Sequence, residues 1–213
     1  MKTDENPREP RVGIRGYRVR DAARHQLRRR QILLGAARAF ARKGYQAASM
    51  DDIAQEAGLA KGHIYHYFAG KEDIFTQIRV TGVSRALERL EAVVNAGDPP
   101  DATLRCAVRD LVASAFGPIE QFAIVLADPP DLSPENHERV RTLQRKYESL
   151  VCEILERGIR QGLFVDGNPK LMMFTLIRAA LGTAIWYRPH GQWEPDWIIE
   201  QVTAQLMRSV LAR

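Results

Sequence analysis

The stretch between Ser49 and Lys71 constrains the fold more than any other part of the chain. Ser49 precedes a pair of aspartates, and a serine followed by acidic residues is a signature of a helix start. We therefore predict a helix over residues 50–57. Gly58 supplies a turn, because glycine tolerates a positive φ. A second helix is predicted over residues 61–67, and it is too short, polar and aromatic to fill a core well. Such a helix is suited to lying in a groove of DNA.

The periodicity of this second helix divides it into faces. Ile64 and Phe68 are four residues apart, so they share one side and are expected to face inward. The outward sides are expected to carry Lys61, Gly62, Tyr65 and His66. Gly62 costs the helix about 1 kcal/mol relative to alanine. Its missing side chain would let the helix backbone approach a groove or a phosphate closely.

The formal net charge of +5 is distributed unevenly along the chain. Residues 1–71 hold 15 Lys and Arg against 7 Asp and Glu, whereas residues 72–213 hold 16 against 19. This asymmetry indicates a polyanionic partner for the N-terminal part alone. The alternative is a solubilising tail, since much of the excess precedes residue 31.

Residues 1–20 contain two prolines, two glycines and five arginines, without an apolar period. Such a segment cannot bury enough apolar surface to order itself, so it is predicted to form a disordered basic arm. The arm could follow phosphates or enter a minor groove of DNA. An inert leader is the alternative.

The rest of the pattern predicts helices only. Apolar residues recur at helical spacing, and no strand-like alternation is sustained. Gly44 is a plausible C-cap for the first helix, and the pairs Ser133-Pro134 and Asn168-Pro169 are helix starts. The predicted helices in addition to the two above cover residues 21–43, 71–95, 101–116, 118–127, 134–161, 169–187 and 195–211. The expected fold class is all-α.

Composition narrows the function classes. The 213 residues are ample for a core without disulfides, and the two cysteines show no metal-like spacing, so a reducing compartment is expected. No apolar run reaches about 18 residues and the N-terminus has no apolar secretory region. We therefore expect a cytoplasmic protein with no membrane partner. No phosphate-binding glycine loop, nucleophile elbow or metal-ligand spacing is present in the sequence, so neither an enzyme nor a cofactor is predicted.

The helices around the turn carry several motifs in a fixed order. They are Phe40, Gly44-Tyr45, Ser49-Met50-Asp51-Asp52-Ile53-Ala54, Ala57-Gly58-Leu59, Gly62-His63-Ile64-Tyr65-His66-Tyr67-Phe68 and Lys71-Glu72-Asp73-Ile74-Phe75. Over about residues 27–75 they resemble the DNA-binding domain of the TetR (tetracycline-repressor-like) family of bacterial transcription regulators. His63 departs from the family, which more often has a small residue such as Thr or Ser there. The resemblance therefore implies no particular operator sequence.

By this resemblance, residues 21–70 form a helix-turn-helix domain and residues 61–67 its recognition helix. The residues expected at bases and adjacent backbone are Lys61, Gly62, His63 and Tyr65, those at phosphates are Tyr67 and Lys71, and those at a second backbone contact are Ser49 and Met50. His66 is also expected to bind DNA, because it faces outward. Lysine can donate to guanine acceptors, and an aromatic ring can touch a thymine methyl. Hydroxyls, lysines and free amides at helix N-termini suit phosphates. The alternative for Tyr65 and Tyr67 is a packing role.

The resemblance assigns residues 71–213 to ligand binding and dimerisation. One helix-turn-helix reads only a few base pairs, so a homodimer on palindromic double-stranded DNA is expected. Residues 171–187 are apolar nearly all round and must be covered on more than one side. The family implies that this helix and residues 195–211 pair with their copies in a second protomer. A buried helix in a monomer is the alternative.

The family also places a ligand pocket in this part of the chain. Aromatic and apolar candidates for its walls, each of which also suits a plain core, are Phe116, Phe122, Leu126, Tyr147 and Phe174. Arg178 lies inside an apolar helix, where a buried charge needs a carboxylate or an acidic ligand as partner. The tail at residues 186–191 is similar to the tails of family members that respond to acyl-coenzyme A thioesters.

The expected function is a DNA-binding transcriptional repressor that a small-molecule effector releases from its operator, the effector being an acyl-CoA or another apolar acid. One alternative is a constitutive helix-turn-helix protein without a ligand, which a C-terminal core lacking a cavity would favour. Another is a helical enzyme or adaptor that carries a basic arm.

Overall fold

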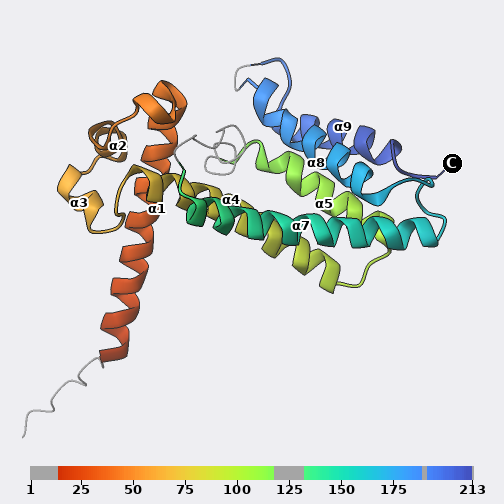
Figure 1. Cartoon of the computed structure of the whole chain (residues 1–213), viewed down its shortest axis with the longest axis horizontal. Helices are drawn as coiled ribbons and strands as arrows, with labels where there is room; N and C mark the ends of the chain where they lie inside the picture. The colour runs from red at the N-terminus through yellow and green to blue at the C-terminus, as the bar shows by residue number, and fades with distance from the viewer. Residues whose placement is uncertain (1–13, 118–131, 189–190, 213) are drawn as a thin grey trace, which may run out of the picture.

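The structure is a computed structural model, and it describes residues 14–117, 132–188 and 191–212, with side chains from Ala22 onward. The described chain folds into eight α-helices, as the sequence pattern predicts, in two units joined by one long helix (Figure 1). The helices are α1 (Ile14–Ala47), α2 (Met50–Ala57), α3 (Lys61–Tyr65), α4 (Lys71–Asn95), α5 (Pro100–Ser114), α7 (Pro134–Arg160), α8 (Pro169–Trp186) and α9 (Pro195–Arg208). The helix expected over residues 118–127 lies outside the described residues.

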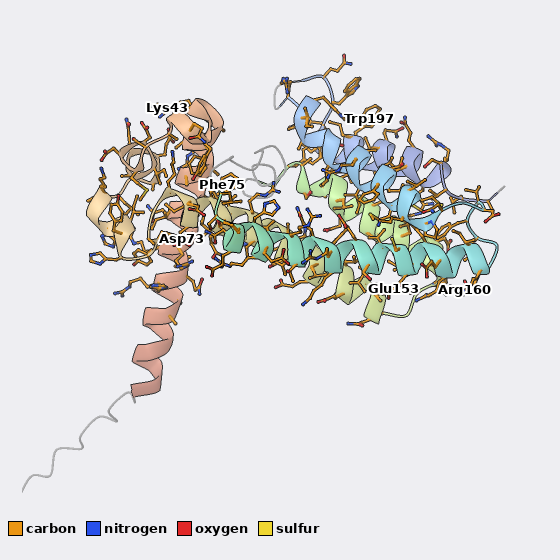
Figure 2. The ribbon with its side chains drawn as sticks, in the orientation of Figure 1. Lys43, Asp73, Phe75, Glu153, Arg160 and Trp197 are labelled. Atoms are coloured by element: carbon orange, nitrogen blue, oxygen red, sulfur yellow. The ribbon has the colours of Figure 1, made fainter. Side chains whose placement is uncertain are left out.

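Helices α1, α2 and α3 form the N-terminal unit, which closes against the start of α4 (Figure 1). Apolar side chains from all four helices share one core. Phe40 on α1 and Phe75 on α4 meet edge to face, with ring centroids 6.2 Å apart. Ile64 anchors α3 in this core and is fully buried. Figure 2 shows Phe75 at the junction between the two units.

Local capping sets the ends of α2. The Ser49 side chain accepts from the Asp52 amide, and the Asp52 carboxylate accepts from the Ser49 amide in return. Gly58 ends the helix in the left-handed conformation, with φ 64°. These signals are local, so the predicted bounds of α2 are the observed ones.

Helix α1 differs from its predicted bounds at both ends. It begins at Ile14, so residues 14–20 are helical although the sequence pattern assigns them to an arm. Adding residues to an existing helix avoids the unfavourable step of forming a first turn. Helix α1 therefore extends beyond the part that packs against the core, toward the N-terminus. Gly44, the predicted C-cap, interrupts the helix with φ 75° and ψ 160°, but a last turn follows it up to Ala47. Helix α3 is also shorter than predicted and ends at Tyr65.

Helices α5, α7, α8 and α9 form the C-terminal bundle together with α4, and α5 contacts each of the others (Figure 1). Ser133 and Asn168 cap α7 and α8, each followed by proline at the first position, as the sequence predicts. Helix α9 ends at Arg208, short of the predicted residue 211. The chain after it pairs with the loop before α8 instead, where the Val165 amide donates to the Val210 carbonyl over 2.9 Å.

Across the described ranges, no helix combines the length and apolar character that a membrane crossing requires. The same residues contain no group of three or more His, Cys, Asp or Glu side chains that could hold a metal ion.

Candidate nucleic-acid interface and effector cavity

The short helix α3 presents a polar, aromatic face to solvent. Ile64 and Phe68 fix its inner side, with exposed fractions of 0% and 2%. Tyr65 remains 50% exposed although it is a large aromatic residue. The exposed residues of this face are Lys61, Gly62, His63, Tyr65 and His66. The predicted division into faces is therefore confirmed for Lys61, Gly62, Tyr65 and His66, and His63 is exposed as well.

Lys61 is positioned by the preceding helix. Its Nζ donates to Oδ2 of Asp51, on the first turn of α2, over 2.8 Å. This hydrogen bond and the charge of Asp51 raise the pKa of Lys61. The ammonium is therefore firmly protonated and remains accessible to a base edge or a phosphate, because both side chains lie at the surface.

Tyr67 connects α3 to α1 through its ring and its backbone. The rings of His63 and Tyr67 are stacked, with centroids 5.9 Å apart. The His25 ring also packs on the Tyr67 ring, with centroids 4.8 Å apart. Arg29 donates to the Tyr67 carbonyl over 2.9 Å and lies 4.4 Å from the centre of the Phe68 ring. His25 and Arg29 thus support the face from behind. In the sequence, both residues belong to a run of basic residues. That pattern does not indicate which members of the run contact α3 and which are exposed.

Ser49 and Met50 lie at the N-terminus of α2, where free amides and the helix dipole attract anions. The Ser49 hydroxyl is engaged with Asp52, at 2.8 Å from Oδ2. Hydrogen bonds from Lys43 and Ser49 hold the pKa of Asp52 well below its usual range. Lys43 donates to the same carboxylate over 2.6 Å, and Figure 2 labels it near the end of α1.

Lys71 uses its ammonium group to bind backbone carbonyls at the end of α1. Its Nζ donates to the carbonyls of Tyr45, Gln46 and Ala48 over 2.9, 3.1 and 3.1 Å. It also lies 4.6 Å from the centre of the Tyr45 ring. An ammonium group has three N–H donors, and here each has an acceptor. In this conformation Lys71 has no donor left for a phosphate.

Replacing Gly62 with alanine is expected to separate stability from binding. A Cβ at this position meets nothing within 4 Å, so the helix gains up to about 1 kcal/mol of stability. The added methyl would occupy the face that we expect to approach DNA, and operator affinity should fall by about tenfold, as expected when overpacking costs about 1–3 kcal/mol. Thermal unfolding and operator titration of the same preparation test both parts. An increase in both quantities would place Gly62 outside the interface.

A cavity of about 170 Å³ lies in the C-terminal bundle between α4, α5, α7 and α8. Its lining residues are Arg79, Gly82, Val83, Ala86, Leu111, Ser114, Gln144, Tyr147, Glu148, Phe174, Ile177, Arg178 and Leu181. Burial raises the pKa of Tyr147, so its hydroxyl stays protonated near neutral pH. A core without a cavity would have favoured a constitutive DNA-binding protein with no ligand. The cavity removes that argument.

The predicted pocket residues separate into three groups. Tyr147, Phe174 and Arg178 line the cavity. Phe116 lies elsewhere and packs edge to face on Tyr187, with ring centroids 4.6 Å apart. Phe122 and Leu126 lie outside the described residues.

Arg178 corrects one expectation. The sequence pattern predicts a buried charge with a carboxylate or an acidic ligand as partner. The residue is instead exposed in the single chain and makes no ion pair or hydrogen bond to the described part of the chain. The helix is apolar nearly all round in sequence, but neighbouring helices cover only part of it in the single chain. Arg178 lies at the edge of the covered part, where its side chain borders the cavity and solvent.

The uncovered side of α8 and the start of α9 form an apolar face. Its exposed members are Leu171 at 65%, Phe174 at 36%, Ile185 at 67%, Trp186 at 47%, Trp193 at 48% and Trp197 at 50%. The Trp193 and Trp197 rings stack at 5.6 Å. Figure 2 shows Trp197 at the upper edge of the C-terminal bundle. An exposed apolar face of this kind is typical of an interaction site.

A three-helix N-terminal unit with an exposed polar helix after a glycine turn defines a helix-turn-helix regulator of transcription. The comparison with known families agrees. Residues 32–78 match the family described as "Bacterial regulatory proteins, tetR family", and residues 97–210 match "Tetracyclin repressor-like, C-terminal domain". The chain belongs to this family of transcriptional regulators, which are not enzymes.

Individual relatives support the assignment. The transcriptional repressor KstR2 of Rhodococcus jostii (strain RHA1) is 27% identical over 180 residues, spanning 82% of this chain and 86% of that protein. A TetR/AcrR-family regulator from Thermobifida fusca YX-ER1 is 33% identical and covers 84% of this chain and 96% of its own, with a TM-score of 0.66. AibR, solved with isovaleryl coenzyme A and operator DNA, is 25% identical, covers 84% and 98%, and has a TM-score of 0.74.

Proposed function

We propose that this regulator binds palindromic operator DNA as a homodimer in the cytoplasm and represses transcription until a small molecule releases it. The observation that carries the proposal is the exposed face of α3, held on a rigid apolar support. Two proteins that this chain resembles support the proposal. KstR2 is a transcriptional repressor, and the structure of AibR was solved in complex with operator DNA.

We place five residues of α3 and its C-cap in the major groove: Lys61, Gly62, His63, Tyr65 and His66. The Met50 amide, at the start of α2, is proposed to meet a phosphate. Ser49 is proposed to act by capping this helix, because its amide and hydroxyl are both bound to Asp52. Tyr67 is half-buried and could donate from its hydroxyl to the DNA backbone. Lys71 is proposed to act by positioning α1 rather than by contact, because its donors are occupied.

The homodimer is proposed to form through α8 and α9. The uncovered apolar face on these helices supports this placement, since it needs a partner and belongs to the C-terminal bundle rather than to the unit that holds α3 (Figure 1). A second copy of the chain would supply a matching apolar face and a second recognition helix. Two half-sites then follow from the symmetry of the dimer.

The effector is proposed to be an acyl-CoA or another apolar acid. Mostly apolar walls and the exposed, unpaired guanidinium of Arg178 suit a molecule with one apolar and one anionic part. AibR, which was solved with isovaleryl coenzyme A, has the same fold. An effector releases DNA only if it binds one conformation better than the other. A constitutive regulator remains the second candidate if no acyl-CoA changes operator affinity.

Changing Tyr65 or Lys61 to alanine is expected to weaken operator binding by about tenfold to a hundredfold, since a good base contact is worth about 1–3 kcal/mol. Operators are first obtained by selection from random duplexes with the wild-type protein. Losing the lysine should also reduce the slope of log affinity against log salt by about 1 per protomer. Lys170→Ala, which removes an exposed charge from α8, is the matched control. Wild-type affinity in both variants would refute the assignment of the site.

A further inference from the structure

The first turn of α4 contacts both units through adjacent residues. On one side, Lys71 holds the connection between α1 and α2 through the three carbonyls described above. Asp73 accepts from the Ala69 amide over 3.0 Å and so fixes the link from α3 (Figure 2). The N-terminal unit is therefore bound firmly to the start of this helix.

On the other side, Glu72 holds the start of α7. Its Oε1 accepts from the Ser133 amide over 2.9 Å and from Nδ2 of Asn136 over 2.8 Å. These hydrogen bonds, from Asn136 and then from Ser133, lower the pKa of Glu72. Its carboxylate is therefore ionised near neutral pH and gains from both donors. Ser133 is itself the N-cap of α7, so the contact is made to the fixed end of that helix.

The same two helices pack against each other, and both line the cavity. Arg79, Gly82 and Val83 of α4 lie about two to three turns beyond Glu72, and α7 contributes Gln144, Tyr147 and Glu148. A molecule that pushes α4 and α7 apart would lengthen the hydrogen bonds at the other end of the pair. Hydrogen bonds weaken steeply beyond their normal distance, so small shifts of the helices would break this contact.

We propose that Glu72 is a positioning residue for DNA binding, which couples the N-terminus of α7 to the helix-turn-helix. With Glu72 bound to Ser133 and Asn136, the N-terminal unit has one orientation on the C-terminal bundle. Without this contact α4 pivots, and the spacing of the two recognition helices in the dimer fluctuates. The inference rests on the proposed function, because it concerns the regulation of the same DNA-binding face.

A double-mutant cycle tests the coupling with the selected operator duplex as probe. Asn136→Ala alters neither charge nor any residue of the DNA face, yet it should weaken operator binding by about tenfold, the value expected when a hydrogen bond to a charged group is lost. Glu72→Ala should weaken binding at least as much. Removing a negative charge would by itself strengthen binding to DNA, so the sign of this effect separates positioning from simple electrostatics. The double variant should be no weaker than Glu72→Ala alone.

Three further readouts distinguish positioning from a general loss of structure. The salt dependence of operator binding should keep its wild-type slope in Asn136→Ala, because no phosphate contact is lost. Glu72→Gln, which keeps an acceptor oxygen, should recover most of the affinity. Hydrogen exchange at the Ser133 amide should slow when operator DNA binds the wild type. Glu135→Ala, at an exposed neighbour, is the matched control for the lost charge and should bind operator at least as tightly as the wild type does.

The outcomes separate this inference from the proposed function. Operator binding by the wild type together with unchanged affinity in Asn136→Ala, or strictly additive losses in the cycle, would overturn the coupling and leave the regulator intact. Failure of the wild type to select any duplex would overturn the proposed function itself. Circular dichroism of each variant at the assay temperature confirms that the compared proteins are folded.

Discussion

Replacing Gly35 with alanine is expected to destabilise the N-terminal unit by about 3 kcal/mol and to remove most operator binding, although alanine is the better helix former. A Cβ at Gly35 would lie 2.6 Å from the backbone nitrogen of Ala57 and 2.7 Å from its Cβ. Backbone atoms cannot turn aside as a flexible side chain can. Helices α1 and α2 would have to separate, which opens the core that holds α3.

Thermal unfolding and operator titration measure this effect, and Gly62→Ala is the control. Both substitutions add one methyl to a helical glycine, but only the first meets backbone within 3 Å. We expect opposite signs for the two changes in stability. Valine at Gly35 should be worse than alanine because it adds more volume to the same contact. An alanine variant as stable as the wild type would mean that α1 and α2 can part without cost.

The close contact at Gly35 could not be predicted from the sequence. A glycine inside a helix indicates a close approach or a weak point, and only the tertiary packing shows that Ala57 is the neighbour. The bounds of α2 and α4 were predictable because their signals are local, namely a serine cap, acidic first turns and a left-handed glycine. The projection of α1 to Ile14 was not, since helix extension leaves no capping signal there.

The candidate site divides in the same way. The outward face of α3 follows from residue spacing within one helix, so the sequence predicts it. The partners of Lys71 and Arg178 depend on which other segments fold next to them. Two carbonyls in the last turn of α1 and one just after it bind Lys71, and partial cover leaves Arg178 exposed at a cavity edge. A family resemblance transfers residue types, but it does not transfer these long-range contacts.

Replacing Ile185 with glutamate is expected to abolish the homodimer at micromolar concentration. Ile185 is 67% exposed in the single chain and lies beside Trp186 on the uncovered face of α8. An unpaired carboxylate buried between two apolar faces costs several kcal/mol, and the twofold symmetry introduces the charge twice. Operator affinity should fall by more than about a hundredfold, because each monomer then reads a single half-site.

Sedimentation equilibrium and operator titration test this prediction together. Val165→Glu is the matched control, since Val165 is 40% exposed but lies in the loop between α7 and α8, at the opposite end of α8 from Ile185. The control should remain dimeric and bind operator normally. A dimeric Ile185→Glu protein would exclude this part of α8 from the interface. A monomeric variant with unchanged operator affinity would mean that one recognition helix is sufficient, and the palindromic half of the proposed function would have to be abandoned.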